Sequence, residues 1–410
     1  MRFRAFDKER DQEATRRIWR EIGWLSAGQE EVMDTYVGAC QGHVAEVDGQ
    51  AECLVLTAPG TARYLDATLP LCGVTGVTTS RVVRRQGCAT RLTARAIAER
   101  ATAGDVVAGL GMFEQGFYNR LGMGTGGYEH QVSFDPSRLA VQGRPRIPLR
   151  FTPEDWKQLH QARMERRLGH GAVTMTPAAL TRAETLEDGR KGFGLGYRDG
   201  PEAAISHYVW LSAEDVSHGP YHVRWMAYQT GDQFMELMQV IKALGDQVMR
   251  VTMQEPGHVM MQDLIEQPFK QSRMTRHTNW EAGVRGSAWW QARILDLAAC
   301  LAATTVAEGA LRFNLSLGDP IVAYLPEDAP WRGVAGEYVV TLGQESSARR
   351  GHEPDLPTLE ATVNAFTRLW LGVRPASGLA ITDGLRGPAE LLAALDRTLR
   401  LPEPHIDWPL

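Results

Sequence analysis

The sequence lacks the features that mark membrane-spanning, disulfide-rich and nucleic-acid-binding proteins. Its five cysteines are widely spaced over 410 residues without a C-x-x-C pair, so neither a disulfide framework nor a thiolate zinc site is predicted. No stretch approaches the roughly 18 uncharged apolar residues that span a bilayer, and the first residues lack the apolar region of a signal peptide. These absences predict a cytoplasmic protein with no membrane span and no metal site.

Dense blocks of positive charge are also missing. The chain has 44 Lys and Arg against 49 Asp and Glu, a net charge of −5, and affinity for nucleic acids rests largely on neutralising backbone phosphates. We therefore expect no nucleic-acid partner. The 43% hydrophobic content is that of an ordinary globular chain, and at roughly 100–200 residues per domain the length predicts two to four domains, of which we expect three.

The pattern of residues divides the chain into 1–140, 141–286 and 287–410. The first part alternates helical and strand-like segments, with a hairpin turn at Asp48-Gly49. The second part repeats this layout in weakened form, with its own hairpin at Asp199-Gly200, which suggests an internal duplication.

In the last part the pattern changes. We predict an amphipathic helix over 290–303, a strand over 311–317, a helix over 359–370 and another over 388–399. Residues 401–410 contain three prolines and must run extended. We expect the apolar side chains of Trp408 and Leu410 in this tail to be buried.

One loop carries most of the chemical information. A strand-like run, 69–79, leads into Arg84-Arg85-Gln86-Gly87-Cys88-Ala89, which opens a helix. Amides at a helix N-terminus favour a pyrophosphate, Arg84 and Arg85 add positive charge, and Gly87 and Ala89 allow close approach to the backbone. The alternative is a solvated helix start, because a basic pair before a glycine is common. The corresponding segment of the second part, 229–233, has no arginine, so this copy is expected to bind no nucleotide.

A second element, Phe117-Tyr118-Asn119-Arg120-Leu121-Gly122-Met123, follows directly after a predicted strand. Together the two elements resemble the GCN5-related N-acetyltransferases (GNAT), whose coenzyme A loop reads (Gln/Arg)-x-x-Gly-x-(Gly/Ala) and whose later helix carries Phe-Tyr-x-x-x-Gly-(Phe/Met). The whole chain resembles the enhanced intracellular survival (Eis) family. Trp290-x-x-Arg293-x-Leu295-Asp296, where that family's third domain begins, supports the likeness.

The resemblance implies a fold and an activity. The fold is α/β (α+β): a catalytic GNAT domain over 1–140, a degenerate second GNAT domain over 141–286, each with a mixed, mostly antiparallel sheet flanked by helices, and an α+β sterol-carrier-like domain over 287–410. The implied enzyme transfers acetyl from acetyl-CoA to a primary amine of a small cationic acceptor, aminoglycoside- or polyamine-like, by direct attack. The family also assembles as hexamers, so we expect a homo-oligomer.

The same resemblance implies roles for individual residues. Val77 and Thr79 would offer strand amides to the pantetheine arm, and Arg84, Arg85 and Gly87 would hold the pyrophosphate. Tyr118 would be the general acid, and a phenol with an ordinary pKa of about 10 is protonated at neutral pH. The alternative is a tyrosine that packs its ring and bonds a backbone carbonyl.

The family's general base is the terminal carboxylate of the chain, which here belongs to Leu410. A free carboxyl terminus is ionised at neutral pH and can accept an ammonium proton. Family members commonly end in an aromatic residue, so Leu410 leaves ring stacking with the acceptor in doubt, and a frayed terminus is the alternative. Four acidic side chains could line a pocket for a cationic amine, although such a helical face is usually only solvated. They are Glu30, Glu31, Asp34 and Glu114.

A function of another class stays open beside the enzyme. The chain could be a lipid or acyl-ligand binding protein that uses its sterol-carrier-like domain, with silent GNAT domains. The apolar residues of that domain, such as Phe313, Leu315 and Trp370, could instead pack as a solid core.

Overall fold

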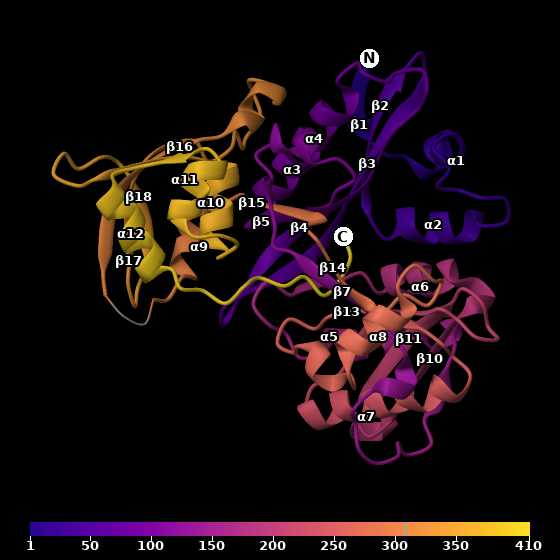
Figure 1. Cartoon of the computed structure of the whole chain (residues 1–410). Helices are drawn as coiled ribbons and strands as arrows, with labels where there is room; N and C mark the ends of the chain where they lie inside the picture. The colour runs from indigo at the N-terminus through magenta and orange to yellow at the C-terminus, as the bar shows by residue number, and fades with distance from the viewer. Residues whose placement is uncertain (307–308) are drawn as a thin grey trace. The chain divides into compact units, whose positions relative to one another are not determined.

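The computed structural model describes residues 1–306 and 309–410, which fold as two compact units (Figure 1). The first unit comprises Met1–Gly127, His170–Pro177 and Ala288–Leu410, and the second Tyr128–Gly169 and Ala178–Ser287. Both contain mixed sheets flanked by helices, which confirms the predicted fold class. The domain division at 140 and 286 stays a prediction.

The first unit contains an eight-stranded sheet in the order β1-β2-β3-β4-β5-β15-β6, with β9 paired to β3. Its strands are β1 (Arg2–Ala5), β2 (Gln41–Val47), β3 (Gln50–Tyr64), β4 (Ala67–Thr79), β5 (Val107–Gly111), β6 (Gly124–Thr125), β9 (Val173–Met175) and β15 (Trp290–Ile294). The helices beside it are α1 (Lys8–Glu21), α2 (Glu30–Gly38), α3 (Cys88–Thr102) and α4 (Gln115–Asn119). The hairpin predicted at Asp48-Gly49 is confirmed, because β2 and β3 pair antiparallel around it.

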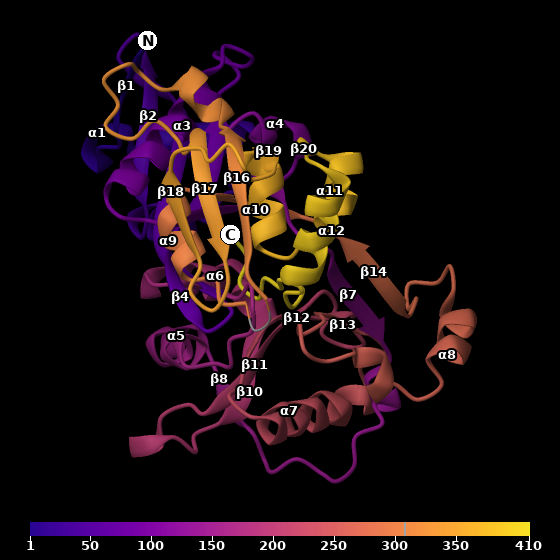
Figure 2. The ribbon, with the colours of Figure 1, turned by 90° about the vertical axis from the view of Figure 1, so that its left-hand side faces the viewer.

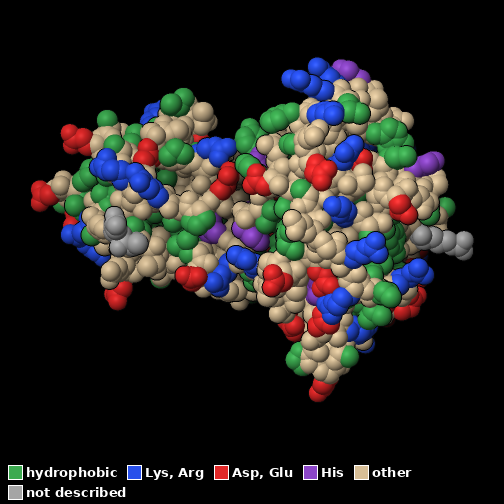
Figure 3. All heavy atoms as spheres, turned by 60° about the horizontal axis from the view of Figure 1, so that its bottom comes forward, with side chains coloured by type: hydrophobic (Ala, Val, Ile, Leu, Met, Phe, Trp, Pro, Cys, Tyr) green, Lys and Arg blue, Asp and Glu red, His purple; other side chains and the backbone are tan. Residues whose placement is uncertain are grey.

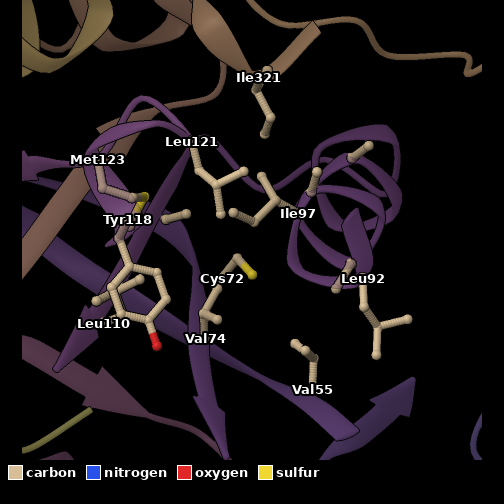
Figure 4. Close-up of a cluster of buried hydrophobic side chains, with 14 of the residues drawn as sticks. Val55, Cys72, Val74, Leu92, Ile97, Leu110, Tyr118, Leu121, Met123 and Ile321 are labelled. Carbon is tan, nitrogen blue, oxygen red and sulfur yellow. The ribbon is translucent and has the colours of Figure 1, made fainter. Parts of the chain in front are cut away.

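Strand β3 is buried on both faces, and its alternation separates two cores. Leu54 and Leu56 pack with α1 and α2, whereas Cys53 and Val55 pack in the cluster that includes Leu92 of α3 (Figure 4). Helices thus cover both faces of the sheet, which is why this part of β3 reads as a nearly continuous apolar run. Each fully buried leucine contributes about 1.5–3 kcal/mol of hydrophobic stabilisation.

One predicted helix in this unit is wrong. Residues 290–303 begin as strand β15, and only α9 (Leu297–Ala302) is helical. Strand β15 lies between β5 and β6 and pairs antiparallel with both. The segment that directly follows β6 in the chain, β7 (Glu129–Phe134), belongs to the sheet of the second unit.

The rest of the first unit is a five-stranded sheet in the order β18-β17-β16-β19-β20, seen side by side in Figure 2. Its strands are β16 (Leu311–Gly318), β17 (Gly336–Leu342), β18 (Ser347–Arg350), β19 (Thr358–Thr362) and β20 (Leu385–Arg386), and its further helices are α10 (Val363–Trp370), α11 (Ala376–Thr382) and α12 (Ala389–Thr398). The predicted strand at 311–317 and helix at 388–399 are confirmed. The helix predicted over 359–370 is shorter, because Leu359 lies on β19 and the helix begins after Thr362 caps its amides.

The second unit holds a seven-stranded sheet in the order β14-β7-β13-β12-β11-β10-β8. Its remaining strands are β8 (Leu149–Phe151), β10 (Gly192–Tyr197), β11 (His207–Ala213), β12 (Tyr221–Ala227), β13 (Val251–Gln254) and β14 (Gly283–Ser287), and its helices are α5 (Trp156–Met164), α6 (Ala178–Glu187), α7 (Gly231–Ala243) and α8 (Pro268–Thr275). The second predicted hairpin is confirmed, because β10 and β11 pair antiparallel.

Acidic and basic side chains are interspersed on the face drawn in Figure 3, as expected for a net charge of −5. Within residues 1–306 and 309–410, no helix has both the length and the apolar character needed to cross a membrane.

Candidate functional site

The first unit's large sheet opens between β4 and β5. These parallel strands pair only from Leu71 to Gly73 on β4, opposite Val107 to Gly109 on β5. Beyond that point β5 pairs with β15, and in the described part of the chain the β4 segment 74–79 pairs on its β3 side alone. Backbone groups on the open side of β4 are therefore left for a ligand.

A bulge in β4 lies at this opening. The register with β3 shifts between Leu54 and Leu56, so that Gly76 and Val77 together face the single residue Val55. A bulge bends its strand and redirects the local backbone groups. Val77 lies at this bend and lines the pocket described below, whereas Thr79 lies at the end of the strand.

The loop after β4 ends at an uncapped helix. Arg85 and Gly87 both have left-handed backbones, with φ of 61° and 73°, and Gly87 is the N-cap of α3 without a side-chain hydrogen bond to the helix. The first amides of a helix have no partner within it, and here no cap satisfies them. Arg84 and Arg85 are exposed, and Ala89 is half-buried in the first turn. This donor set, helix amides with two guanidinium groups, fits a pyrophosphate.

Tyr118 lies on α4, just after β5. Its ring is buried in the cluster with Val74, Leu110 and Leu121, as Figure 4 shows. Burial raises the pKa of Tyr118 to about 12, so the phenol keeps its proton at neutral pH. Among the described residues no side chain or carbonyl bonds its hydroxyl, unlike the alternative considered from the sequence.

The carboxyl-terminal tail runs extended and is fixed along the first unit. Ile406 and Trp408 are buried, the His405 amide donates to the His170 carbonyl at 2.9 Å, and the Val173 amide donates to Asp407 Oδ1 at 3.2 Å. A frayed tail does not fit these contacts.

Leu410 lies beside two glycines of β5. A Cβ atom on Gly109 would stand 2.8 Å from Leu410 Cδ1, and one on Gly111 would stand 2.8 Å from Leu410 O. The side chain also lines a narrow apolar cavity of about 40 Å³ together with Leu71 and Val107. The leucine side chain thus anchors the tail, while its backbone oxygen faces the other end of β5.

Tyr118 and Leu410 line one pocket of about 250 Å³. Its walls come from β4, from the end of β5 and from three aromatic residues. The lining residues are Trp24, Val74, Thr75, Gly76, Val77, Gly111, Met112, Phe113, Tyr118, Trp289 and Leu410. Of the candidate residues from the sequence, the structure brings Val77, Tyr118 and Leu410 together here, and the others follow along the end of β4 and the loop.

None of the four acidic residues considered from the sequence is among these lining residues. Asp34 is bonded by Arg16, Glu30 is bonded by Arg20, and neither Glu31 nor Glu114 lines the pocket. The aromatic lining was missed from the sequence. Trp24, Phe113 and Trp289 come from three distant segments, and no local motif connects them.

The comparisons with known proteins agree with this geometry. Residues 4–126 match the family model described as an acetyltransferase (GNAT) domain. These residues form a GNAT domain. A GNAT domain uses acetyl-CoA as its co-substrate, so the chain is an N-acetyltransferase, and the donor set of the loop and the open edge of β4 fit that co-substrate. No curated protein matches the sequence.

Solved structures share the fold over the full length. A probable N-acyltransferase from Enterococcus faecalis has a TM-score of 0.78 at 19% identity, covering 100% of this chain and 99% of that chain. A GCN5-related N-acetyltransferase from Anabaena variabilis has a TM-score of 0.78 at 15% identity, with 100% of both chains covered. Eis1 from Mycobacterium abscessus has a TM-score of 0.74 at 19% identity, again with 100% of both covered. At these identities the likeness shows the fold.

Proposed function

We propose that the GNAT domain acetylates a primary amine of a small cationic molecule by direct attack. The observation that carries this proposal is the shared pocket of Tyr118 and Leu410 beside the open edge of β4. An acid and a base at one pocket suit a reaction in which a proton leaves one reactant and another is given to the leaving group.

Acetyl-CoA supplies an acyl carbon activated as a thioester and a sulfur that departs with its bonding electrons. In the proposed mechanism the Leu410 carboxylate takes a proton from the acceptor's ammonium group, and the Tyr118 hydroxyl holds the proton destined for the departing sulfur. A pKa of about 12 keeps that proton on Tyr118 until it is needed. No cysteine has to serve as nucleophile, and Cys53, Cys72 and Cys88 are buried.

Binding of the co-substrate is assigned to two groups of residues. Arg84, Arg85 and the amides from Gly87 to Ala89 would hold the pyrophosphate, and the amides of Val77 and Thr79 would hold the pantetheine arm. The uncapped N-terminus of α3 and the unpaired edge of β4 support this assignment.

The acceptor itself is proposed only as an amine. The family likeness suggested aminoglycosides or polyamines, but the described lining residues include no Asp or Glu to hold several ammonium groups. Trp24 and Phe113, whose ring centroids are 5.5 Å apart, offer aromatic surface to an acceptor.

We also propose the Eis-like layout, with a sterol-carrier-like fold for 287–410 and a homo-oligomer, possibly a hexamer, as the assembled form. The five-stranded sheet with its helices supports the first of these. The alternative function, lipid or acyl-ligand binding by this domain, stays a prediction. Its candidate tunnel residues Phe313, Leu315 and Trp370 are buried, and the Trp370 ring stacks on Tyr64 at 4.2 Å.

The test is thiol release from acetyl-CoA with a panel of aminoglycosides, polyamines and arylalkylamines. The intact chain is compared with one extended by a single glycine after Leu410, which moves the carboxylate by about one residue, roughly 3.6 Å. We expect a loss of about 100-fold in kcat on extension with unchanged affinity for acetyl-CoA, because the base is displaced while the loop is untouched.

A matched control replaces Leu410 by Met, which keeps a flexible apolar anchor and the carboxylate, and should stay within about 3-fold of the intact chain. Full activity of the extended chain would contradict the base assignment. Failure of the intact chain to bind acetyl-CoA in calorimetry would contradict the proposed co-substrate site and the mechanism built on it.

A further inference from the structure

The helix that carries Tyr118 is too short to be stable without contacts to the rest of the protein. Helix α4 spans five residues, Gln115–Asn119, and its N-cap, Glu114, makes no side-chain bond to it. Isolated helical segments of this length are unstable in water, because the first turn fixes several residues for a single hydrogen bond. The direction of the Tyr118 side chain must therefore be set by groups outside the helix.

Backbone bonds join Tyr118 to the turn that follows it. The Leu121 amide donates to the Tyr118 carbonyl at 2.9 Å, and the Met123 amide donates to the same carbonyl at 3.3 Å. The Gly122 amide donates to the Asn119 carbonyl at 3.0 Å, and a carbonyl oxygen can accept a second hydrogen bond. The carbonyls of Leu121 and Met123 follow the end of the helix and can accept donors from outside it.

Two side chains from the last third of the chain supply these donors. Asn364 on α10 donates through Nδ2 to the carbonyls of Asn119 and Met123, both at 2.8 Å. Arg293 on β15 donates through Nη1 to the Leu121 carbonyl. The two side chains together bond the carbonyls at residues 119, 121 and 123, on both sides of the turn.

The arginine is itself held in a fixed direction. Its Nη2 donates to Asp319 Oδ2 at 2.6 Å, and both side chains are fully buried. Asp319 in turn accepts the amides of Ile321 at 3.1 Å and Val334 at 2.9 Å. A buried ion pair whose remaining oxygen sites are bonded has little freedom to rotate.

Gly122 makes the approach possible. Its φ is +80°, and a Cβ atom there would stand 2.7 Å from Arg293 Nη1 and 2.6 Å from Val363 Cγ1. The glycine that ends the Phe-Tyr-x-x-x-Gly pattern is thus required for its backbone conformation and for the space that the guanidinium occupies.

We propose that Asn364 and Arg293 are positioning residues for Tyr118, and that the last third of the chain orients the general acid of the first domain. This inference rests on the proposed role of Tyr118. Neither side chain lines the pocket with Tyr118, so both act through the turn and not on the acceptor.

The test is a double-mutant cycle on kcat, measured as thiol release from acetyl-CoA with the best amine of the panel. We expect Asn364→Ala to lower kcat about 10-fold in the otherwise unchanged chain, with the KM for acetyl-CoA unchanged. In the Tyr118→Phe background the same substitution should change kcat by less than about 2-fold, because a misdirected ring without a hydroxyl loses nothing further.

Asn314→Ala is the matched control. Asn314 also donates through Nδ2 to two backbone carbonyls, those of Glu353 at 2.7 Å and Leu356 at 3.0 Å, but it lies on β16 and neither carbonyl belongs to the turn after Tyr118. Its loss should lower thermal stability and leave kcat within about 2-fold. Arg293→Lys, which keeps a cation beside Asp319, is a second variant and should follow Asn364→Ala in both backgrounds.

The outcomes are distinct. Equal losses from Asn364→Ala in both backgrounds, or an equal loss from Asn314→Ala, would overturn the inference while the acid role of Tyr118 stands. Undiminished kcat of Tyr118→Phe alone would remove that acid role and the inference with it.

Discussion

Helices α3 and α7 each follow a strand that forms a short parallel pairing, β4 with β5 and β12 with β13. Their N-termini are nevertheless capped differently. Helix α3 begins at Gly87 with no side-chain cap and two exposed arginines before it. Helix α7 begins with a capping box: Thr230 accepts the Gln233 amide, and the Gln233 side chain accepts the amides of Gln229 and Thr230. One helix leaves its first amides available to a ligand, and the other satisfies them itself.

A second difference follows the next strand. After β5 comes α4 with Tyr118, whereas the segment after β13, residues 255–265, contains no tyrosine. In the second unit, therefore, neither the uncapped helix start with its two arginines nor the phenol has a counterpart. The two units therefore differ at the two features to which the proposed mechanism assigns co-substrate binding and proton donation.

The largest expected effect comes from removing the phenol that distinguishes the first unit. Tyr118→Phe should lower kcat by about 10²–10³-fold, because general acid catalysis contributes in that range, and should leave acetyl-CoA binding unchanged in calorimetry. Tyr324→Phe is a control, since that ring packs against the same core cluster outside the pocket. A loss in both variants would point to packing and not to proton transfer.

The pH profile adds to this test. Since burial raises the pKa of Tyr118 to about 12, the phenol stays protonated through pH 10, where an ordinary tyrosine is half ionised. We expect the part of kcat that depends on Tyr118 to stay constant from pH 8 to pH 10. A fall with a midpoint near 10 would contradict the burial argument.

A smaller effect is expected when the first helix is made to resemble the second. Gly87→Asp would place a carboxylate next to the first amides of the helix, where a Cβ atom meets nothing within 4 Å, and an Asp tolerates the left-handed backbone better than most residues. Repulsion between unit charges about 8 Å apart at an effective dielectric of ~20 is about 2 kcal/mol, so acetyl-CoA affinity should fall about 30-fold.

Gly87→Asn separates the effect of charge from that of side-chain shape when the acetyl-CoA affinity of both variants is measured by calorimetry. It adds a side chain of nearly the same shape without the negative charge and should weaken binding less than Gly87→Asp does. Equal affinities of the two variants and the intact chain would mean that this helix start binds no phosphate.

The smallest effect is expected at the capped helix. Thr230→Ala breaks the capping box of α7 and should reduce the free energy of unfolding of the second unit by about 1 kcal/mol, measured by urea denaturation. Acetyl-CoA affinity and kcat should not change. A change in either would show that the second helix start takes part in function.

The strand, loop and helix around Gly87 were predictable from the sequence because their signals are local. Arginines, a glycine and a small residue between a strand and a helix lie within a few positions, and α3 begins at Cys88, close to the predicted start. The hairpins were predictable for the same reason, since their turn residues lie between paired strands.

Strand β15 was not predictable because its partners are distant. Its residues read as helix formers, yet the Trp290–Ile294 backbone pairs with β5 and β6, more than 160 positions earlier in the chain. Because β15 is buried on both faces, its sequence also lacks the alternation of apolar and polar residues that marks a half-exposed strand. The hydrogen bonds of Arg293 and Asn364 to the turn after Tyr118 also join segments far apart in the chain, so no local pattern could indicate them.

The insertion of β15 sets an order of events during synthesis of the protein. Strand β5 ends at Gly111 and its neighbour begins at Trp290, so one edge of β5 has no partner until about 180 further residues have been made. At roughly 5–20 residues per second that interval lasts about 10–35 s. During this interval the unpaired edge of β5 is available to other chains, which is a route to misassembly of the growing polypeptide.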